Sequence, residues 1–418
     1  MRCLRLLVVI FAFAAGEDLL FKLPEVDPTY GDAEYLKKEK DILLVLKYIH
    51  QPNWNADLHA FADSYSINDD YENYNNVDLV KEFVHLYNQG RLVKKSEQFS
   101  LYKPQHIEEV KALFNVFYNA KDYKTFFNVV AWARFHINPM VFTYVLGTVL
   151  IHRKDVDTII TPPPYEVCPY SFINAEVIKA AQRLKMQGFI GVEKVDGLKT
   201  VVIPMNYTGW YLHLNPDQKL SYITEDVGVS ALYYNFHLDY PHWMQGKPYG
   251  LDKDRRGEIY ILIHQLMVAR YYLERLSNDL GHIPNFNWRE PIKSGYFPGL
   301  MYSTGKQFTT RHNNYNLYKE GNHKFIQEAE DRERRIREVI DQGFINYGGK
   351  VVPLSSPDDV NTLGNLLQGN PDGFDLHHNF HDHLLPPFLE NYATSPRDPM
   401  FYQFYKRLLK NYWRFMSM

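Results

Sequence analysis

Apolar residues recur at three- and four-residue spacing over most of the chain between residues 29 and 154. The clearest segments are residues 34–51, 77–90 and 104–137. The second segment has marked ends, because Asn76 or Asp78 can cap its start and Gly90 follows its last apolar residue. The spacing places apolar side chains on one helix face, so it predicts amphipathic helices that share a core.

A proline-rich segment, TPPPYEVCPYSF at residues 161–172, interrupts this pattern. Its four prolines do not continue an α-helix, so we interpret the segment as the connection between two domains. Residues 191–215 are rich in β-branched and aromatic residues, with turn signals at Asp-Gly and Thr-Gly. They predict a small sheet or hairpin in the second part of the chain.

Helical spacing also covers most of the second part. The segments are residues 174–187, 225–240, 255–282, 325–345, 358–369 and 398–418. Segment 255–282 is apolar nearly all round, which is typical of a helix in the middle of a bundle. The last segment carries many aromatic rings, and we expect them to need a cover that the remaining sequence does not obviously supply. The predicted fold class is mainly α.

Residues 1–16 have the composition of a secretory signal peptide, with Arg2 and Arg5 before an apolar run at residues 6–15. That run is too short to span a bilayer, and no other segment looks membrane-spanning. We therefore expect a secreted, extracellular protein. The formal net charge of the whole chain is −3, and a mildly acidic protein is a poor candidate for nucleic-acid binding.

The chain is rich in aromatic residues, with 32 Tyr, 26 Phe and an aromatic share of 15%. Either the helices bury unusually many rings, or the composition itself is useful. Cysteine is scarce: Cys3 leaves with the signal and Cys168 remains, so no disulfide forms within the mature chain. We favour an ordinary buried thiol for Cys168, because nothing beside it suggests activation.

Few motifs point to chemistry. Asn206 begins an N-glycosylation sequon, Asn-Tyr-Thr, in a turn-rich segment. The segment LHHNFHDHL brings together His377, His378, His381 and His383. Its turn-rich surroundings favour a solvated cluster over a metal site. The chain has no GxSxG elbow and no glycine-rich phosphate loop, so the residues alone do not indicate an enzyme.

Several segments, in order, resemble the arthropod hemocyanin superfamily, and within it the insect storage hexamerins of the arylphorin or larval serum protein type. They are PPPYEV, VVIPMNYTGWYLHLNPDQKLSYITEDVGV, ALYYNFHLDYPHWM, DRRGEIYILIHQLMVARYYLERLS and SPRDPMFYQFYKRLLKNYW. The resemblance implies an N-terminal all-α domain at residues 17–165 and a hemocyanin middle domain, built on a four-helix bundle, at residues 166–418. The resemblance also implies a C-terminal β-sandwich domain in the family, and we expect that domain to be missing from this sequence.

In oxygen-carrying and phenoloxidase members of that family, six histidines of the bundle hold two copper ions. The resemblance places those six positions on Tyr233, His237, His264, Asn361, Asn365 and Tyr405. Only two of them are histidine. Asparagine amides are poor copper ligands, and a tyrosine must lose its proton to bind. We therefore expect a degenerate copper site, with no metal, no other cofactor and no catalytic residue.

The resemblance implies a secreted amino-acid storage protein of insect hemolymph, a nutrient reservoir rich in Tyr and Phe. It further implies a homo- or hetero-hexamer with related subunits and a possible uptake receptor. An alternative that the sequence leaves open is a carrier of small lipophilic molecules such as hormones. A copper phenoloxidase or oxygen carrier is less favoured, because it requires the missing histidines.

Overall fold

The computed structural model describes residues 10–11, 32–51, 53–188, 194–195, 198–207, 215–319, 321–347, 350–370, 389 and 391–418. The α-helices are α1 (Ala33–Leu46), α2 (Ala56–Ser64), α3 (Val77–Asn88), α4 (Pro104–Asn119), α5 (Tyr123–His136), α6 (Pro139–His152), α7 (Pro164–Val167), α8 (Ala175–Met186), α9 (Ser221–Thr224), α10 (Val227–Asp239), α11 (Arg256–Ser277), α12 (His323–Gln342), α13 (Val360–Gln368) and α14 (Pro399–Met416). The strands are β1 (Ile10–Phe11), β2 (Lys194–Val195), β3 (Leu198–Lys199), β4 (Val201–Val202), β5 (Phe344–Tyr347) and β6 (Lys350–Pro353). The predicted mainly α fold class is confirmed.

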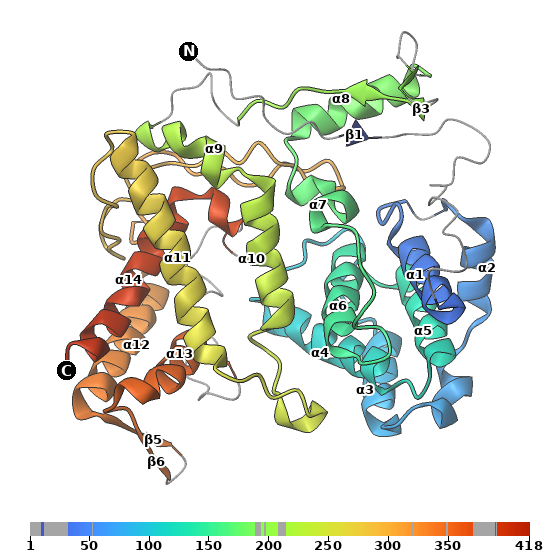
Figure 1. Ribbon diagram of the computed structural model, residues 1–418, viewed down its shortest axis with the longest axis horizontal. Coiled ribbons are helices and arrows are strands. Elements are labelled where there is room, and N and C mark those ends of the chain that lie inside the picture. Colours follow the sequence, from blue (N-terminus) through green and yellow to red (C-terminus); the bar gives the residue numbers. More distant parts are fainter. Residues whose placement is uncertain are drawn as a thin grey trace.

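Helices α1 to α6 form the first part of the molecule, and their ends follow from local chemistry (Figure 1). The side chain of Asn76 accepts a hydrogen bond from the Leu79 N–H at 3.3 Å, and Gly90 adopts a left-handed φ of +66° after α3. The predicted segment 104–137 divides into α4 and α5. Asp122 accounts for the division, because its carboxylate accepts from the Thr125 N–H at 2.7 Å and starts a new helix.

The second part is a bundle of α10, α11, α13 and α14, with α12 packed on α14 (Figure 1). Helices α11 and α13 cross closely at Gly257 and Gly364, where each glycine lies against the backbone of the other. A side chain at either position would push the two helices apart. This crossing fixes how α11 is presented to the other helices of the bundle.

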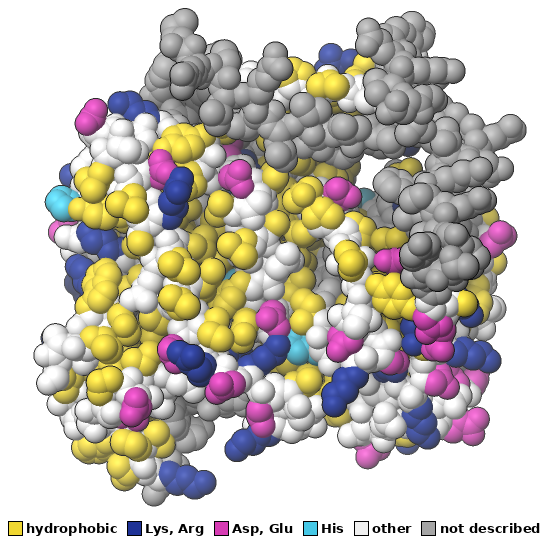
Figure 2. Space-filling model, in the orientation of Figure 1, with side chains coloured by type: hydrophobic (Ala, Val, Ile, Leu, Met, Phe, Trp, Pro, Cys, Tyr) yellow, Lys and Arg dark blue, Asp and Glu magenta, His cyan; other side chains and the backbone are white. Residues whose placement is uncertain are grey.

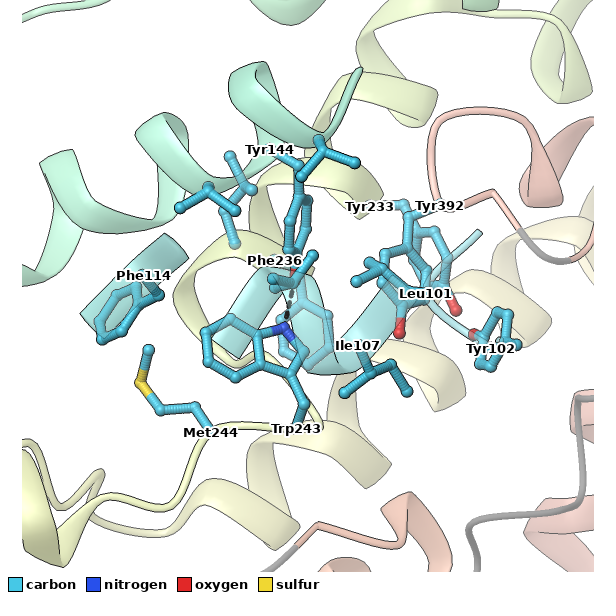
Figure 3. Packing of buried hydrophobic residues seen from close by; sticks show 14 of the residues in the cluster. Leu101, Tyr102, Ile107, Phe114, Tyr144, Tyr233, Phe236, Trp243, Met244 and Tyr392 are labelled. Atoms are coloured by element: carbon cyan, nitrogen blue, oxygen red, sulfur yellow. Dashed lines mark hydrogen bonds between the residues drawn. The ribbon is translucent and has the colours of Figure 1, made fainter. Parts of the chain in front are cut away.

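The two parts share a continuous apolar core, which runs from Ile42 to Phe415. Trp243, in the loop after α10, donates its indole N–H to the hydroxyl of Tyr144 on α6 at 2.9 Å (Figure 3). Residues 161–172, predicted as a connection, fold as the single turn α7 and a 3-10 turn at Pro169–Ser171. The connection thus joins two helical groups that are packed against each other.

The predicted hairpin between residues 191 and 215 is present as β2 and β3, which pair antiparallel. Strand β4 of the same stretch pairs with β1, which falls inside the predicted signal peptide. A second hairpin, β5–β6, forms at residues 344–353, so the helix predicted over residues 325–345 ends earlier than expected, at Gln342. The β content is therefore small, as expected, but it lies in two places.

Two expectations about the bundle need correction. Most rings of α14 pack against other helices, since Phe401, Tyr402 and Phe404 are at most 3% exposed against α11, α12 and α13, whereas Trp413 near the end of the helix is 46% exposed. Conversely, α11 does not lie in the middle of the bundle. Its side chains Leu266 and Leu273 are 58% and 61% exposed, so one apolar face of this helix points outward (Figure 2).

Cys168 is buried, as predicted, and burial raises the pKa of its thiol to about 12. A thiol with that pKa carries almost no thiolate at neutral pH and is unreactive. Among the described helices we find none whose length and apolarity would let it cross a membrane.

Candidate functional site

Four of the six positions inferred from the family resemblance meet in the centre of the bundle. Tyr233 and His237 lie one turn apart on α10, His264 lies on α11 and Tyr405 on α14. All four are buried, with exposed fractions between 0% and 5%. The spacing along each helix was visible in the sequence, and the bundle brings the three helices together as expected.

The hydroxyl of Tyr233 connects these residues. It lies 3.2 Å from Nε2 of His264 and 3.0 Å from the hydroxyl oxygen of Tyr405. On the other side of the imidazole, Nδ1 of His264 lies 2.7 Å from the carbonyl oxygen of Tyr260. A carbonyl only accepts, so Nδ1 donates, and in a neutral imidazole Nε2 then accepts the proton of Tyr233. The Tyr233 oxygen in turn accepts from Tyr405.

Each histidine is also covered by a tyrosine ring. The ring of Tyr405 stacks on His264 with centroids 3.9 Å apart, and the ring of Tyr392 stacks on His237 at 3.5 Å and 6°. Tyr392 precedes α14, and its hydroxyl lies 2.8 Å from Nδ1 of His242 (Figure 3 shows it beside Tyr233). Sequence reasoning missed Tyr392, because it belongs to no periodic segment and meets His237 across a long sequence separation.

Burial keeps these phenols protonated. Desolvation raises the pKa of Tyr233, Tyr260 and Tyr392 well above the usual value near 10. Desolvation also raises the pKa of Tyr405, to about 12. At physiological pH these phenols are therefore neutral hydrogen-bonding groups, without a tyrosinate.

The two asparagines of the second set have structural partners. The side-chain oxygen of Asn361 on α13 accepts from the N–H of Gly257, in the first turn of α11, at 2.9 Å. The side-chain oxygen of Asn365 accepts from the side-chain amide of Asn370 at 2.9 Å. These bonds hold the α11–α13 crossing and the end of α13. At positions where the resemblance places copper ligands, the Asn361 amide thus connects two helices and the Asn365 amide stabilises the end of α13.

The chain matches two protein-family models, and their boundaries agree with the two helical groups of the structure. Residues 35–158 match the family described as "Hemocyanin, all-alpha domain", and residues 163–412 match "Hemocyanin, copper containing domain". The chain belongs to the hemocyanin superfamily. The resemblance seen in its sequence is thereby confirmed.

Within this superfamily, the chain is similar to insect proteins of the hexamerin and arylphorin type. Arylphorin subunit alpha of Manduca sexta is 33% identical over 90% of this chain and 58% of its own length. Larval serum protein 2 of Drosophila melanogaster is 33% identical over 98% of this chain and 60% of its own length. Hexamerin 70c of Apis mellifera is 32% identical over 93% of this chain and 60% of its own length. The chain thus spans about 60% of the length of these relatives.

Solved structures of hemocyanin-superfamily members have the same fold. A crustacean hemolymph-type prophenoloxidase superposes with a TM-score of 0.71 at 22% identity, over 90% of this chain and 60% of its own. A scorpion hemocyanin superposes with a TM-score of 0.69 at 24% identity, over 90% of this chain and 59% of its own. At these identities the likeness establishes the fold alone.

The residues of this hemocyanin-type bundle do not fit a copper pair. A copper that binds dioxygen needs several neutral imidazoles converging on it with an open position. Here two imidazoles are present, the ring of Tyr392 lies flat on His237, and the Tyr233 hydroxyl occupies Nε2 of His264. Across the described part of the chain, no three His, Cys, Asp or Glu side chains are placed to hold a metal ion.

Two further sequence candidates lie at the edge of the described residues or outside them. Asn206 is exposed in the extended segment after β4, and the sequon's Thr208 lies outside the described residues, so its glycosylation stays a prediction. The histidine cluster at residues 377–383 also lies outside the described residues.

Proposed function

We propose that this chain is a secreted amino-acid storage protein of hexamerin type, which binds neither copper nor dioxygen and catalyses no reaction. The observation that carries this proposal is the hydroxyl of Tyr233, hydrogen-bonded to both His264 and Tyr405 where a metal ion would otherwise sit. A centre filled by neutral, mutually bonded side chains contributes to stability and leaves no open coordination position.

The placement of the aromatic residues supports storage. The chain holds 32 Tyr and 26 Phe, and many of their rings are packed in the interior. The rings of Tyr271 and Tyr402, for example, stack at 3.8 Å between α11 and α14. Rings buried in pairs raise the Tyr and Phe content without exposing apolar surface, so the protein can accumulate to high concentration.

Assembly and compartment follow the same proposal. Relatives are named as subunits of arylphorin and as a larval serum protein. We propose that this chain likewise forms a homo- or hetero-hexamer in hemolymph, enters cells through an uptake receptor and carries a glycan on Asn206. The predicted signal peptide and the exposure of Asn206 support secretion and glycosylation.

A carrier role for lipophilic molecules gains no support from the cavity between the two helical groups. This cavity, lined by Phe99, Tyr144, Tyr234 and Tyr392 among others, measures about 60 Å³. That volume holds about two water molecules, whereas sites for small organic ligands measure about 300–1,000 Å³. A hormone-sized molecule does not fit this cavity. The more open pocket beside α8, lined by Ala175, Ile203, Leu300 and Phe308 among others, measures about 410 Å³, so a carrier role stays the alternative function.

Isotope tracing tests the storage proposal. The protein is purified with ring-labelled tyrosine, returned to the hemolymph of late larvae and followed through the moult by mass spectrometry. We expect its intact mass to disappear and the label to enter newly made cuticle and tissue proteins. A matched sample labelled only at leucine controls for general turnover. Intact protein that persists unchanged through the moult would contradict storage.

A further inference from the structure

A pocket walled by aromatic rings lies in the first helical group, beside α3 and α5. It measures about 160 Å³, and its lining includes Tyr65, Phe83, Tyr87 and Trp132. A cavity of about 150 Å³ with apolar walls is large enough to bind one benzene ring. This aromatic pocket therefore has room for one six-membered ring and for little else.

The rings of the aromatic pocket are held in fixed positions. Phe83 and Tyr87 lie one turn apart on α3, and each ring meets the indole of Trp132 edge to face, with centroids 6.1 Å and 5.1 Å apart. On α5, Trp132 stacks on His136 at 4.6 Å. Phe83 and Trp132 are buried, whereas Tyr87 is 38% exposed at the rim. A ligand ring would thus enter a preformed site, and little side-chain freedom would be lost on binding.

A second, acidic pocket adjoins the aromatic one. It measures about 470 Å³ and shares Tyr65 and Ser66 with the aromatic pocket. Its lining carries more acidic than basic side chains, namely Asp69, Asp70 and Asp122 against Lys124. The acidic pocket therefore has a net negative charge, which favours a cation over a neutral group or an anion.

The two pockets lie within the reach of a small molecule. Asn68 lines the aromatic pocket and the next residue, Asp69, lines the acidic one. Consecutive Cα atoms are about 3.8 Å apart. The hydroxyl of Tyr65, which lines both pockets, also donates to the carboxylate of Asp70 at 2.7 Å. A ligand with its ring in the aromatic pocket can therefore place a cation in the acidic one through a short carbon chain.

From this juxtaposition we propose that the two pockets form one binding site for a primary arylalkylamine, an aromatic ring joined to an ammonium group by a short carbon chain. The ring packs among Phe83, Tyr87 and Trp132, where apolar burial and ring contacts stabilise it. The ammonium group passes Tyr65 and pairs with the carboxylate of Asp69. The inference goes beyond storage, because it assigns a ligand to a specific site. Its failure would leave the proposed function unaffected.

Equilibrium dialysis of the full chain against radiolabelled tyramine tests the site. We expect one saturable site per chain with a Kd below about 1 mM. p-Cresol has the same phenol ring without the ammonium group, so we expect it to bind at least about fivefold more weakly. Sodium chloride at about 1 M should weaken the binding of tyramine more than that of p-cresol, because it screens the charge. Equal affinity for the two compounds, or no saturable binding of tyramine by the folded protein, would overturn the proposal.

A substitution at the rim tests the aromatic half of the site. We expect Tyr87→Ala to weaken tyramine binding about tenfold, because the ligand ring loses one of its walls. Phe344→Ala, on the β5–β6 hairpin, is the matched control, since it removes an aromatic ring of similar exposure (40%) away from both pockets. Circular dichroism reports whether each variant is folded. A folded Tyr87→Ala protein that binds tyramine as the wild type does would place the ligand elsewhere and overturn the proposal.

A change of charge tests the acidic half. We expect Asp69→Asn to reduce the affinity for tyramine toward that of p-cresol and to leave the affinity for p-cresol unchanged, because only the ion pair is lost. Asp78→Asn is the matched control, since Asp78 is an exposed aspartate in the first turn of α3 and lines neither pocket. An equal loss of tyramine affinity in both variants would show a general effect of surface charge and would contradict the assigned site.

Discussion

The hydroxyl of Tyr233 lies 3.2 Å from Nε2 of His264, the nitrogen through which this imidazole would bind a metal. Nδ1 of the same ring donates to the carbonyl oxygen of Tyr260, which fixes the tautomer and leaves Nε2 as the acceptor. The hydroxyl of Tyr233 on α10 thereby occupies the nitrogen of His264 on α11 that a metal ion would otherwise coordinate. The buried centre of the bundle is held by hydrogen bonds and stacked rings.

Removing this hydroxyl should destabilise the fold. Tyr233→Phe leaves Nε2 of His264 and the hydroxyl of Tyr405 without this partner in a buried site, so we expect a loss of about 1–3 kcal/mol. Tyr272→Phe is the matched control, because its hydroxyl lies 2.9 Å from His282 at an exposed position. Urea unfolding of both variants gives the comparison. Equal, small losses would show that the buried bond does not stabilise the centre.

The helix crossing at Gly257 and Gly364 predicts a reversal of the usual glycine effect. Within an ordinary helix, Gly→Ala stabilises by about 0.5–1 kcal/mol. At Gly364 the new methyl group would lie inside the backbone of Gly257, so we expect Gly364→Ala to destabilise by several kcal/mol, on the order of an overpacked core. Gly228→Ala in α10 meets only the side chain of Asp226 and should change stability by less than about 1 kcal/mol. Thermal unfolding decides between these outcomes.

Glu109 predicts a specific pH dependence. Burial raises the pKa of this carboxyl to about 7, although the Val93 N–H donates to it at 2.6 Å and lowers it in part. The folded state therefore holds this proton between about pH 4.5 and 7, where the unfolded state has released it. The contribution of Glu109 to stability is highest at low pH and is lost as the pH rises through that window.

Comparison of wild type with Glu109→Gln measures this contribution. We expect the variant to gain relative stability by up to about 1.4 kcal/mol per pH unit between pH 5 and 7, because its amide does not titrate. Glu108→Gln, one position earlier and ion-paired with Arg91 at the surface, controls for removal of a carboxylate from α4. A Glu109→Gln difference that stays constant with pH would show that Glu109 is charged in the folded protein.

Glycosylation of Asn206 can be tested by the mass of the secreted protein. In secreted protein from insect cells, we expect Asn206→Gln to remove one N-linked glycan from the mass spectrum, because the side chain is exposed. Asn215→Gln, a change in the same region without a sequon, should leave the glycan in place. Identical glycan masses for Asn206→Gln and the wild type would rule out this site.

The helices were predictable because their apolar residues repeat every three or four positions, and Asn76 and Gly90 mark the ends of α3 by chemistry that is local. The outward face of α11 was not. Its sequence is apolar on both sides, and period alone does not tell which side the rest of the chain covers. The hairpin β5–β6 was missed because the helical spacing of residues 325–345 continues into the first two residues of β5.

The candidate site was predictable only in part. Family resemblance placed Tyr233 and His264 on facing helices, and the structure brings them together. The stacking of Tyr392 on His237 depends on a non-periodic segment more than 150 positions further along the chain, so local sequence carries no signal for it. The direction of the hydrogen bonds through His264 likewise depends on three-dimensional neighbours.

Metal stoichiometry tests the central claim most directly. The purified full chain is incubated with excess cuprous ion under argon, desalted, and analysed for copper by inductively coupled plasma mass spectrometry, with a hemocyanin treated in parallel as the control. Because the resemblance places imidazoles at the positions of Tyr233, Asn361, Asn365 and Tyr405, we predict that the chain retains essentially no copper while the hemocyanin retains its full complement. Retention of two copper ions per chain would contradict the account.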